Sequence, residues 1–243
     1  MNYLDSLVII AVAGLIHASF QLSVSMLTLL SSHTIGRRRS QARLLALMNS
    51  FTLGAAVMTV LLLSFAALVV SLSLDTRQNT LLAWTVTCGL LGGVGLAVWL
   101  FYYRREVGTT LWIPRGMARF LNRRAKSTKD PTEAFGLGLI SVLAELLFVL
   151  APILVAALVL VELPTTWQLV GIALYTVVSL LSLFVVNAWI GSGHSISRVQ
   201  RWRESNKRFL QFAAGSGLLI LGFYLYVDHV VTVTALAAAG GAL

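Results

Sequence analysis

Residues 135–161, FGLGLISVLAELLFVLAPILVAALVLV, decide the fold class of this chain. The stretch is almost entirely apolar and lacks the apolar–polar alternation of a membrane strand, so it predicts a helix. A helix needs about 20 apolar residues, at about 1.5 Å each, to cross a hydrocarbon core about 30 Å thick. We therefore expect this stretch to span a membrane.

Five further apolar runs of similar length predict five more membrane-spanning helices. They cover residues 7–30, 44–72, 81–103, 168–190 and 209–231. Of the 243 residues, 58% are hydrophobic and only 11% are charged, whereas a soluble domain has about 25% charged residues. This composition excludes a soluble domain and predicts an all-α integral membrane protein with six transmembrane helices.

Basic residues predict the orientation of these helices. Every Lys and Arg except Arg77 lies within residues 31–43, 104–134 or 191–208, which follow the first, third and fifth runs. By the positive-inside rule these loops face the cytoplasm, and both termini lie outside. The net charge of +9 is explained by this topology, so we expect no nucleic-acid partner. The predicted location is the inner or plasma membrane.

The long basic loop divides the chain into three regions. We expect a first three-helix unit at 1–103, a basic linker at 104–134 and a second three-helix unit at 135–243. Within the linker, apolar and basic residues recur at helical spacing, which indicates an amphipathic helix on the inner membrane surface. The alternative is a solvated basic loop. The residues concerned are Ile113, Met117, Phe120 and Leu121, and Arg115, Arg119, Arg123 and Arg124.

Two motifs recur in the two halves of the chain. GLIHASFQL begins at Gly14 and GLISVLAEL begins at Gly138, so Gln21 and Glu145 occupy matching positions. The third and sixth runs share GLL, at 89–91 and 217–219. Each half contains three predicted spans, an odd number, so the two halves cross the membrane in opposite orientations. This is the arrangement of inverted-repeat transporters. We therefore predict two inverted three-helix repeats.

These motifs resemble those of the CcdA/DsbD-type membrane domain, a member of the LysE-like transporter superfamily. The resemblance rests on GLI in the first run, FGLGLI and the later APIL at 151–154 in the fourth, and GLLILGFYL in the sixth. It implies a bundle of two inverted repeats that either transfers electrons between thiols or exports small solutes. The redox members carry cysteines beside prolines in spans 1 and 4. Here the single cysteine is Cys88, in the third run, and of the two prolines only Pro152 has a counterpart.

Polar residues inside the apolar runs are the candidate binding site. Glu145 is the only acid deep in a run, where a charge costs about 2.5–3.5 kcal/mol on insertion scales. It is either a proton or cation site or a protonated group that bonds neighbouring helices. His17 and Gln21 share a helix face at spacing i, i+4. We expect both to approach Glu145, although His17 alone is compatible with a bond to a backbone carbonyl.

Four more residues complete the candidate substrate or ion site. Pro152 has no N–H to donate to the carbonyl of Phe148, so we expect a kink one turn past Glu145. Ser23 provides a hydroxyl that lines span 1 or bonds its own helix. Asn49 and Asn187 lie near the inner ends of the second and fifth runs, at positions that we take as matching. They form an inner gate or an interhelical hydrogen bond.

No sequence motif indicates an enzyme. The chain has no nucleotide-binding loop, no HExxH motif and no hydrolase nucleophile elbow. One cysteine excludes an internal disulfide and cysteine-based zinc chemistry. We therefore expect no catalytic residue, cofactor or metal site. Gly89 and Gly93 form a GxxxG motif, which serves packing inside the bundle or, alternatively, a homodimer.

The sequence thus favours a membrane transporter of a small solute or ion, with export as the predicted direction and proton coupling through Glu145. Its expected partners are the lipid bilayer and that substrate. The first alternative is a non-transporting membrane scaffold or assembly protein, in which the polar residues only hold helices together. The second is a thiol-redox conduit that uses Cys88 with the thiol of a partner.

Overall fold

The computed structural model is helical throughout the residues it describes, which are 2–20, 41–74, 76–102, 120–121, 123–125, 127–192, 198, 201–202 and 205–235. These residues contain no strand, which confirms the all-α prediction for them. The elements are α1 (Tyr3–Ser19), α3 (Gln41–Ser73), α4 (Arg77–Ala97), the π-helix η1 (Val98–Tyr102), α6 (Pro131–Val161), α7 (Thr165–Ser179), α8 (Leu181–Gly191), α10 (Lys207–Leu225) and the π-helix η2 (Tyr226–Val231).

Four of the expected spans appear as helical segments that are long and apolar enough to cross a membrane. They cover Ala42–Ser73, Asn79–Phe101, Pro131–Val161 and Arg208–Ala235. A fifth span is formed if α7 and α8 cross together. The described residues therefore contain four or five helical segments that could span a membrane, which indicates a multi-pass membrane protein.

The fifth apolar run, at 168–190, is not one straight helix. It is divided between α7 and α8, which meet at Leu180 with a bend of 53°. The hydroxyls of Thr176 and Ser179 donate to the carbonyls of Ile172 and Thr176, at 2.8 and 3.1 Å. Such back-bonding to the helix's own carbonyls bends helices, and hydropathy alone does not register it.

The first apolar run, at 7–30, is only partly described. Helix α1 has 17 residues and ends at Ser19, which leaves it shorter than the about 20 residues needed to span a bilayer. Residues 21–30 lie outside the described part of the chain. The span predicted for this first run therefore stays a prediction.

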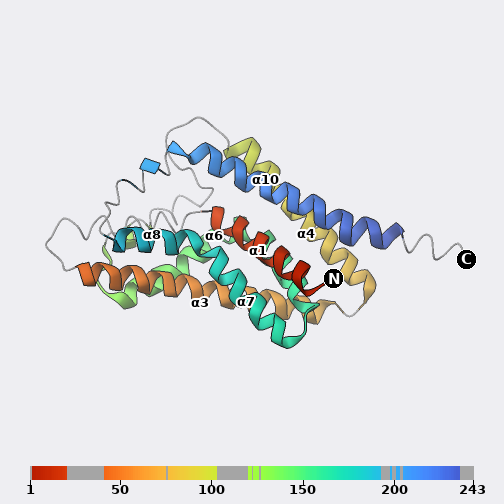
Figure 1. Ribbon diagram of the computed structural model, residues 1–243, viewed down its shortest axis with the longest axis horizontal. Helices are drawn as coiled ribbons and strands as arrows, with labels where there is room; N and C mark the ends of the chain where they lie inside the picture. Colours follow the sequence, from red (N-terminus) through yellow and green to blue (C-terminus); the bar gives the residue numbers. More distant parts are fainter. Residues whose placement is uncertain are drawn as a thin grey trace, which may run out of the picture.

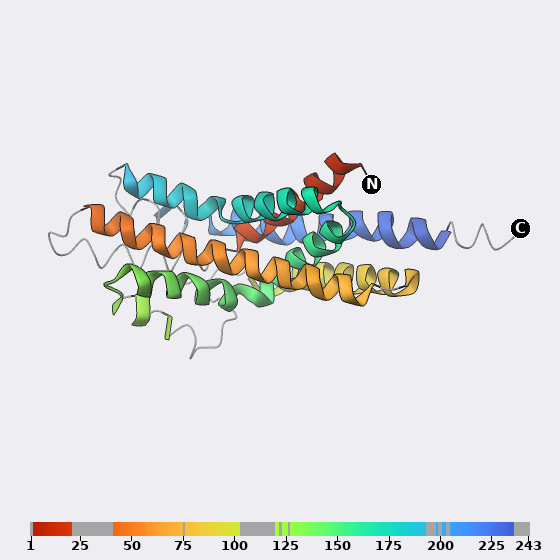
Figure 2. The same cartoon turned by 90° about the horizontal axis from the view of Figure 1, so that it is seen from below.

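The helices lie along one long axis and run in alternating directions, except that α7 and α8 follow one another in the same direction (Figures 1 and 2). The start of α1 and the end of η2 lie toward the same end of the bundle. Three helix pairs are extensively packed: α3 with α6, α4 with α10, and α1 with α7. Each pair joins a helix of the N-terminal half to one of the C-terminal half, so the halves are intertwined.

The described part of the linker packs against the bundle. Its residues 120–121, 123–125 and 127 are helical, and Leu121 and Ala125 are buried in a cluster with α3 and α6. Leu121 faces the protein, while Phe120 is 49% exposed, so these two members of the predicted amphipathic helix point to different surroundings. Residues 104–119, with the rest of the predicted amphipathic helix, lie outside the described residues.

Candidate functional site

Glu145 lies in the interior of α6 and is only 2% exposed. Ser141, one turn earlier on the same helix, is fully buried, and its hydroxyl donates to the carbonyl of Gly138 at 2.8 Å. Helix α6 is an uninterrupted apolar helix of 31 residues, and Glu145 lies near its centre. The structure therefore holds an ionisable side chain at the depth where the bilayer centre is expected.

His17 of α1 is paired with Tyr175 of α7. The Nδ1 atom of His17 lies 3.0 Å from the Tyr175 hydroxyl, and both side chains are buried, with exposures of 3% and 0%. Their ring centroids are 5.7 Å apart. A buried imidazole and a buried phenol thus satisfy each other across the interface of two helices.

Tyr175 is absent from the residues expected at the site. The sequence contains one signal that points to it, because Tyr175 stands inside the apolar run at 168–190. A phenol hydroxyl far from the membrane surface needs a hydrogen-bond partner inside the protein. The pattern does not reveal that the partner is His17.

Glu145 and His17 lie on opposite sides of an aromatic contact between α6 and α1. Phe148 and Phe20 stack with centroids 5.5 Å apart, and the two helices run in opposite directions (Figure 2). Each polar residue precedes its stacked phenylalanine by three positions. The predicted approach of His17 to Glu145 stays a prediction.

Gln21 and Ser23 follow directly after the described part of α1 and lie outside the described residues. The predicted meeting of Gln21 with His17 and Glu145, and the predicted polar wall at Ser23, thus stay predictions. Pro152 is buried in α6, which continues as one helix from Pro131 to Val161. A break between two helices occurs at Leu180, between α7 and α8, while the predicted kink at Pro152 stays a prediction.

Asn49 and Asn187 are brought together between α3 and α8. The side-chain amide of Asn187 donates to the hydroxyl of Thr52 at 2.9 Å and lies 3.4 Å from the side-chain oxygen of Asn49. This geometry is the interhelical hydrogen bond that the sequence offered as one of two alternatives. Thr52 was not expected there. The two asparagines are 138 positions apart, whereas Gly14 and Gly138 are 124 apart, so the asparagines do not match in the register of the GLI motifs.

Two aromatic stacks lie at opposite ends of the α4–α10 pair. Trp84 of α4 stacks on His229 of η2, with centroids 3.9 Å apart, and Phe212 of α10 stacks on Trp99 of η1 at 5.6 Å. The Nε2 atom of His229 lies 3.5 Å from the Asp228 carboxylate. Within the described part of the chain, no three His, Cys, Asp or Glu side chains are grouped to hold a metal ion.

Comparisons of the chain with protein-family models, with curated proteins and with solved structures give no match.

Proposed function

We propose that this protein is a membrane transporter of a small solute or ion, built from two inverted three-helix repeats and coupled to protons through Glu145. The observation that carries the proposal is the buried carboxyl of Glu145 inside an apolar helix. An ionisable group at that depth is costly for a protein that uses it only for packing. Protonation removes the charge and with it most of the cost of enclosing the group.

The glycine contacts of two helix pairs support the repeat. A Cβ atom on Gly138 would collide with the carbonyl oxygen of Phe51, and one on Gly14 would lie 3.3 Å from the carbonyl oxygen of Tyr175. Gly138 follows Gly14 by 124 residues, and Tyr175 follows Phe51 by the same 124. The crossing of α6 on α3 therefore uses the same register as the crossing of α1 on α7.

The α4–α10 pair supports the repeat independently. Phe212 follows Trp84 by 128 residues, the offset that also relates Gly217 to Gly89. Each of the two rings stacks on the π-helical end of the opposite helix. The π-helices themselves begin 128 residues apart, at Val98 and Tyr226. Such reciprocal contacts are expected when two equivalent units face each other across a twofold axis.

The direction of the helices favours an inverted relation between the halves. Helices α1 and α7 run together in one direction, while α6 and α3 run together in the other (Figure 2). The positive-inside rule assigns the basic loops to the cytoplasmic side, and six spans with that assignment would have both termini outside. The resemblance to the LysE-like superfamily agrees with it, and the distance of Cys88 from the family's cysteine positions favours solute transport over thiol redox chemistry.

In the proposed mechanism, transport depends on two features of this bundle, which are Glu145 and the bend at Leu180. Glu145 takes a proton or a substrate cation from one side and releases it to the other as the repeats move relative to each other. The bend at Leu180 gives α7 freedom to move separately from α8, and α7 carries Tyr175, the partner of His17. His17 and Tyr175 then provide the polar contacts that respond to the position of α7.

The test is flux through the purified protein in proteoliposomes. Vesicles containing a pH dye are challenged with a panel of small cations, amino acids and anions, and the wild type is compared with Glu145→Gln. The matched control is Glu162→Gln, which removes an exposed acid at the end of the same helix. We expect substrate-dependent proton movement in the wild type and the control, and its loss in Glu145→Gln.

Two outcomes contradict the proposal. Unchanged flux and pH dependence in Glu145→Gln would remove the role of this carboxyl. Absence of flux with every substrate, from wild-type protein that is shown to be folded, would favour the scaffold function instead.

A further inference from the structure

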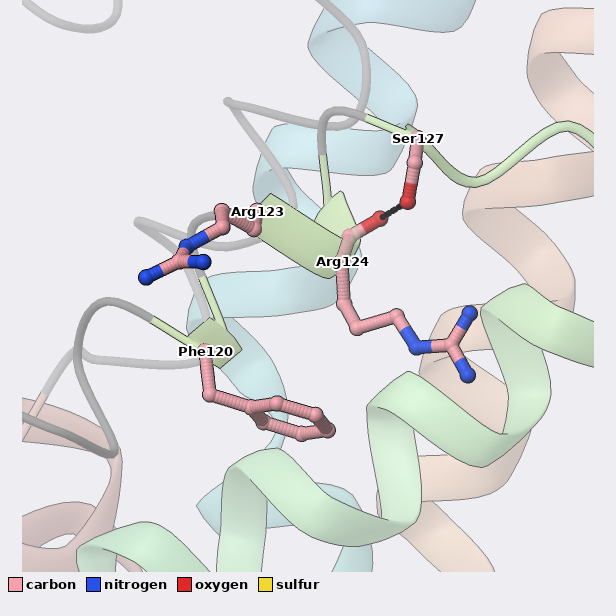
Figure 3. A pocket seen from close by; sticks show the side chains of 4 residues that line it. All are labelled: Phe120, Arg123, Arg124 and Ser127. Carbon is pink, nitrogen blue, oxygen red and sulfur yellow. Dashed lines mark hydrogen bonds between the residues drawn. The ribbon is translucent and has the colours of Figure 1, made fainter.

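A shallow basic hollow lies beside the start of α6, at the end of the bundle where the linker enters it. It encloses about 300 Å³ and is lined by Phe120, Arg123, Arg124 and Ser127 (Figure 3). None of these residues belongs to the candidate transport site. Figure 3 shows both arginine side chains extending away from the linker backbone, on either side of Phe120.

The hollow is held in place by buried residues on the other face of the same segment. Leu121 and Ala125, which are 0% and 1% exposed, pack in a cluster with residues of α3 and α6. Their spacing of four residues places them on one helical face. The arginines at 123 and 124 are thereby directed away from the core while their backbone is anchored to it.

Hydrogen bonds fix the backbone of the linker directly after Arg124. The carbonyl oxygen of Arg124 accepts bonds from the hydroxyl of Ser127, at 3.1 Å, and from the hydroxyl of Thr128, at 2.7 Å. The carbonyl of Lys129, the next residue, accepts a bond from the Arg43 guanidinium of α3 at 3.2 Å. The linker is therefore fixed to two helices next to the arginine pair.

The charge of the arginine pair is not neutralised by the described part of the protein. No described carboxylate lies within ion-pair distance of Arg123 or Arg124. Guanidinium groups bind phosphate oxygens through paired hydrogen bonds. Two adjacent arginines that have no acidic partner among the described residues, anchored at a defined position, are thus suited to bind an anionic phosphate group.

The position of the hollow favours a lipid as the source of the phosphate. The apolar span of α6 begins at Pro131, a few residues after the arginines, which places them at the level of the lipid headgroups. Phe120 is 49% exposed beside them, and an exposed aromatic ring next to basic residues is typical of segments that rest at the boundary of headgroups and acyl chains. A lipid offers both groups, whereas free phosphate offers only one.

We propose that Phe120, Arg123 and Arg124 form a binding site for the headgroup of an anionic phospholipid, such as phosphatidylglycerol. The arginines bind the anionic headgroup from either side of Phe120, and Phe120 contacts the glycerol and the first acyl carbons. This site fixes the linker on the inner membrane surface. It does not depend on the proposed transport activity.

The test is lipid binding to the purified full-length protein, measured by native mass spectrometry. Detergent-solubilised protein is mixed with equal amounts of phosphatidylglycerol and phosphatidylcholine that carry the same acyl chains. We expect the wild type to retain phosphatidylglycerol preferentially, and Arg123→Gln/Arg124→Gln to reduce that preference about tenfold. The matched control, Arg198→Gln/Arg201→Gln, removes the same charge from another exposed basic region and should keep the preference.

Further variants keep the proposal open to refutation. If the Gln variant does not fold, Arg123→Lys/Arg124→Lys preserves the charge but removes the paired geometry, and an intermediate preference is expected. Phe120→Ser should weaken retention of both lipids. Equal loss of preference in the control variant would show that total charge, and not this site, selects the lipid. Displacement of phosphatidylglycerol by millimolar inorganic phosphate would identify a free-phosphate site and overturn the headgroup assignment.

Discussion

The crossing of α3 with α6 and the crossing of α1 with α7 have the same register but different chemistry. At the first, Gly54 and Gly138 each approach the backbone of the other helix so closely that a Cβ atom on either would collide with a carbonyl oxygen. At the second, the position that corresponds to Gly54 is Val178. The Cγ1 atom of Val178 lies 3.1 Å from the position that a Cβ atom on Gly14 would take. The first crossing is a backbone contact, and the second is a side-chain contact.

The polar residues differ in the same way. His17 and Tyr175, which bond each other at the α1–α7 crossing, correspond by the 124-residue offset to Ser141 and Phe51 at the α3–α6 crossing. The closer crossing thus has a small hydroxyl and an apolar ring at the positions where the other crossing has an imidazole and a phenol. The α3–α6 crossing is thus a close contact between backbones, whereas the α1–α7 crossing encloses a hydrogen-bonded pair of side chains.

The largest effect is expected from breaking the closer crossing. Gly138→Ala places a methyl group against the carbonyl of Phe51, and backbone cannot move aside as a side chain can. We expect a loss of roughly 3 kcal/mol, the upper end of the cost of overpacking. The measurement is thermal unfolding of the detergent-solubilised protein. The matched variant Gly14→Ala brings its methyl group no closer than 3.1 Å to Val178 and 3.3 Å to the carbonyl oxygen of Tyr175, so it should lose less. An equal loss in both variants would show that the crossings are equally close.

A smaller effect is expected from removing the polar pair at the wider crossing. Tyr175→Phe keeps the ring but deletes the hydroxyl that lies 3.0 Å from His17. We expect a loss of about 1 kcal/mol in stability, typical of one buried hydrogen bond, and slower flux in the proteoliposome assay. Tyr224→Phe, at a half-exposed tyrosine, should change neither. Normal flux from Tyr175→Phe would reduce this pair to a structural contact.

The smallest effect is expected from the polar bond that ties α3 to α8. Asn187→Leu removes the amide that donates to Thr52 at 2.9 Å. Hydrogen bonds between membrane helices contribute about 0.6 kcal/mol on average, so a small decrease in melting temperature is expected without loss of flux. Asn49→Leu, which removes only the contact at 3.4 Å, should cost less still. Loss of flux in either variant would return these residues to the role of an inner gate.

The sequence predicts those features that depend on one segment at a time. Long apolar runs predict the helices, and the repeated GLI at Gly14 and Gly138 marks the two residues that meet corresponding carbonyls. Glu145 is recognisable as an acid in an apolar run. The bond from His17 to Tyr175 is different, because it joins residues 158 positions apart and depends on how two helices are aligned. The bend at Leu180 and the inward direction of Leu121 likewise result from local hydroxyl bonds and tertiary packing that hydropathy does not describe.

The two π-helices have a consequence for how this chain tolerates insertions and deletions. A π-turn accommodates one more residue than an α-turn, so the side chains beyond it are rotated by about 100° relative to a continuous α-helix. Trp99 and His229 both lie within these turns. Removal of a single residue from η1 or η2 would restore α-helical phase and turn one of these rings away from its partner. In this protein, a one-residue deletion at either position acts as a rotation of a helix end, whereas the same deletion in a loop would change only its length.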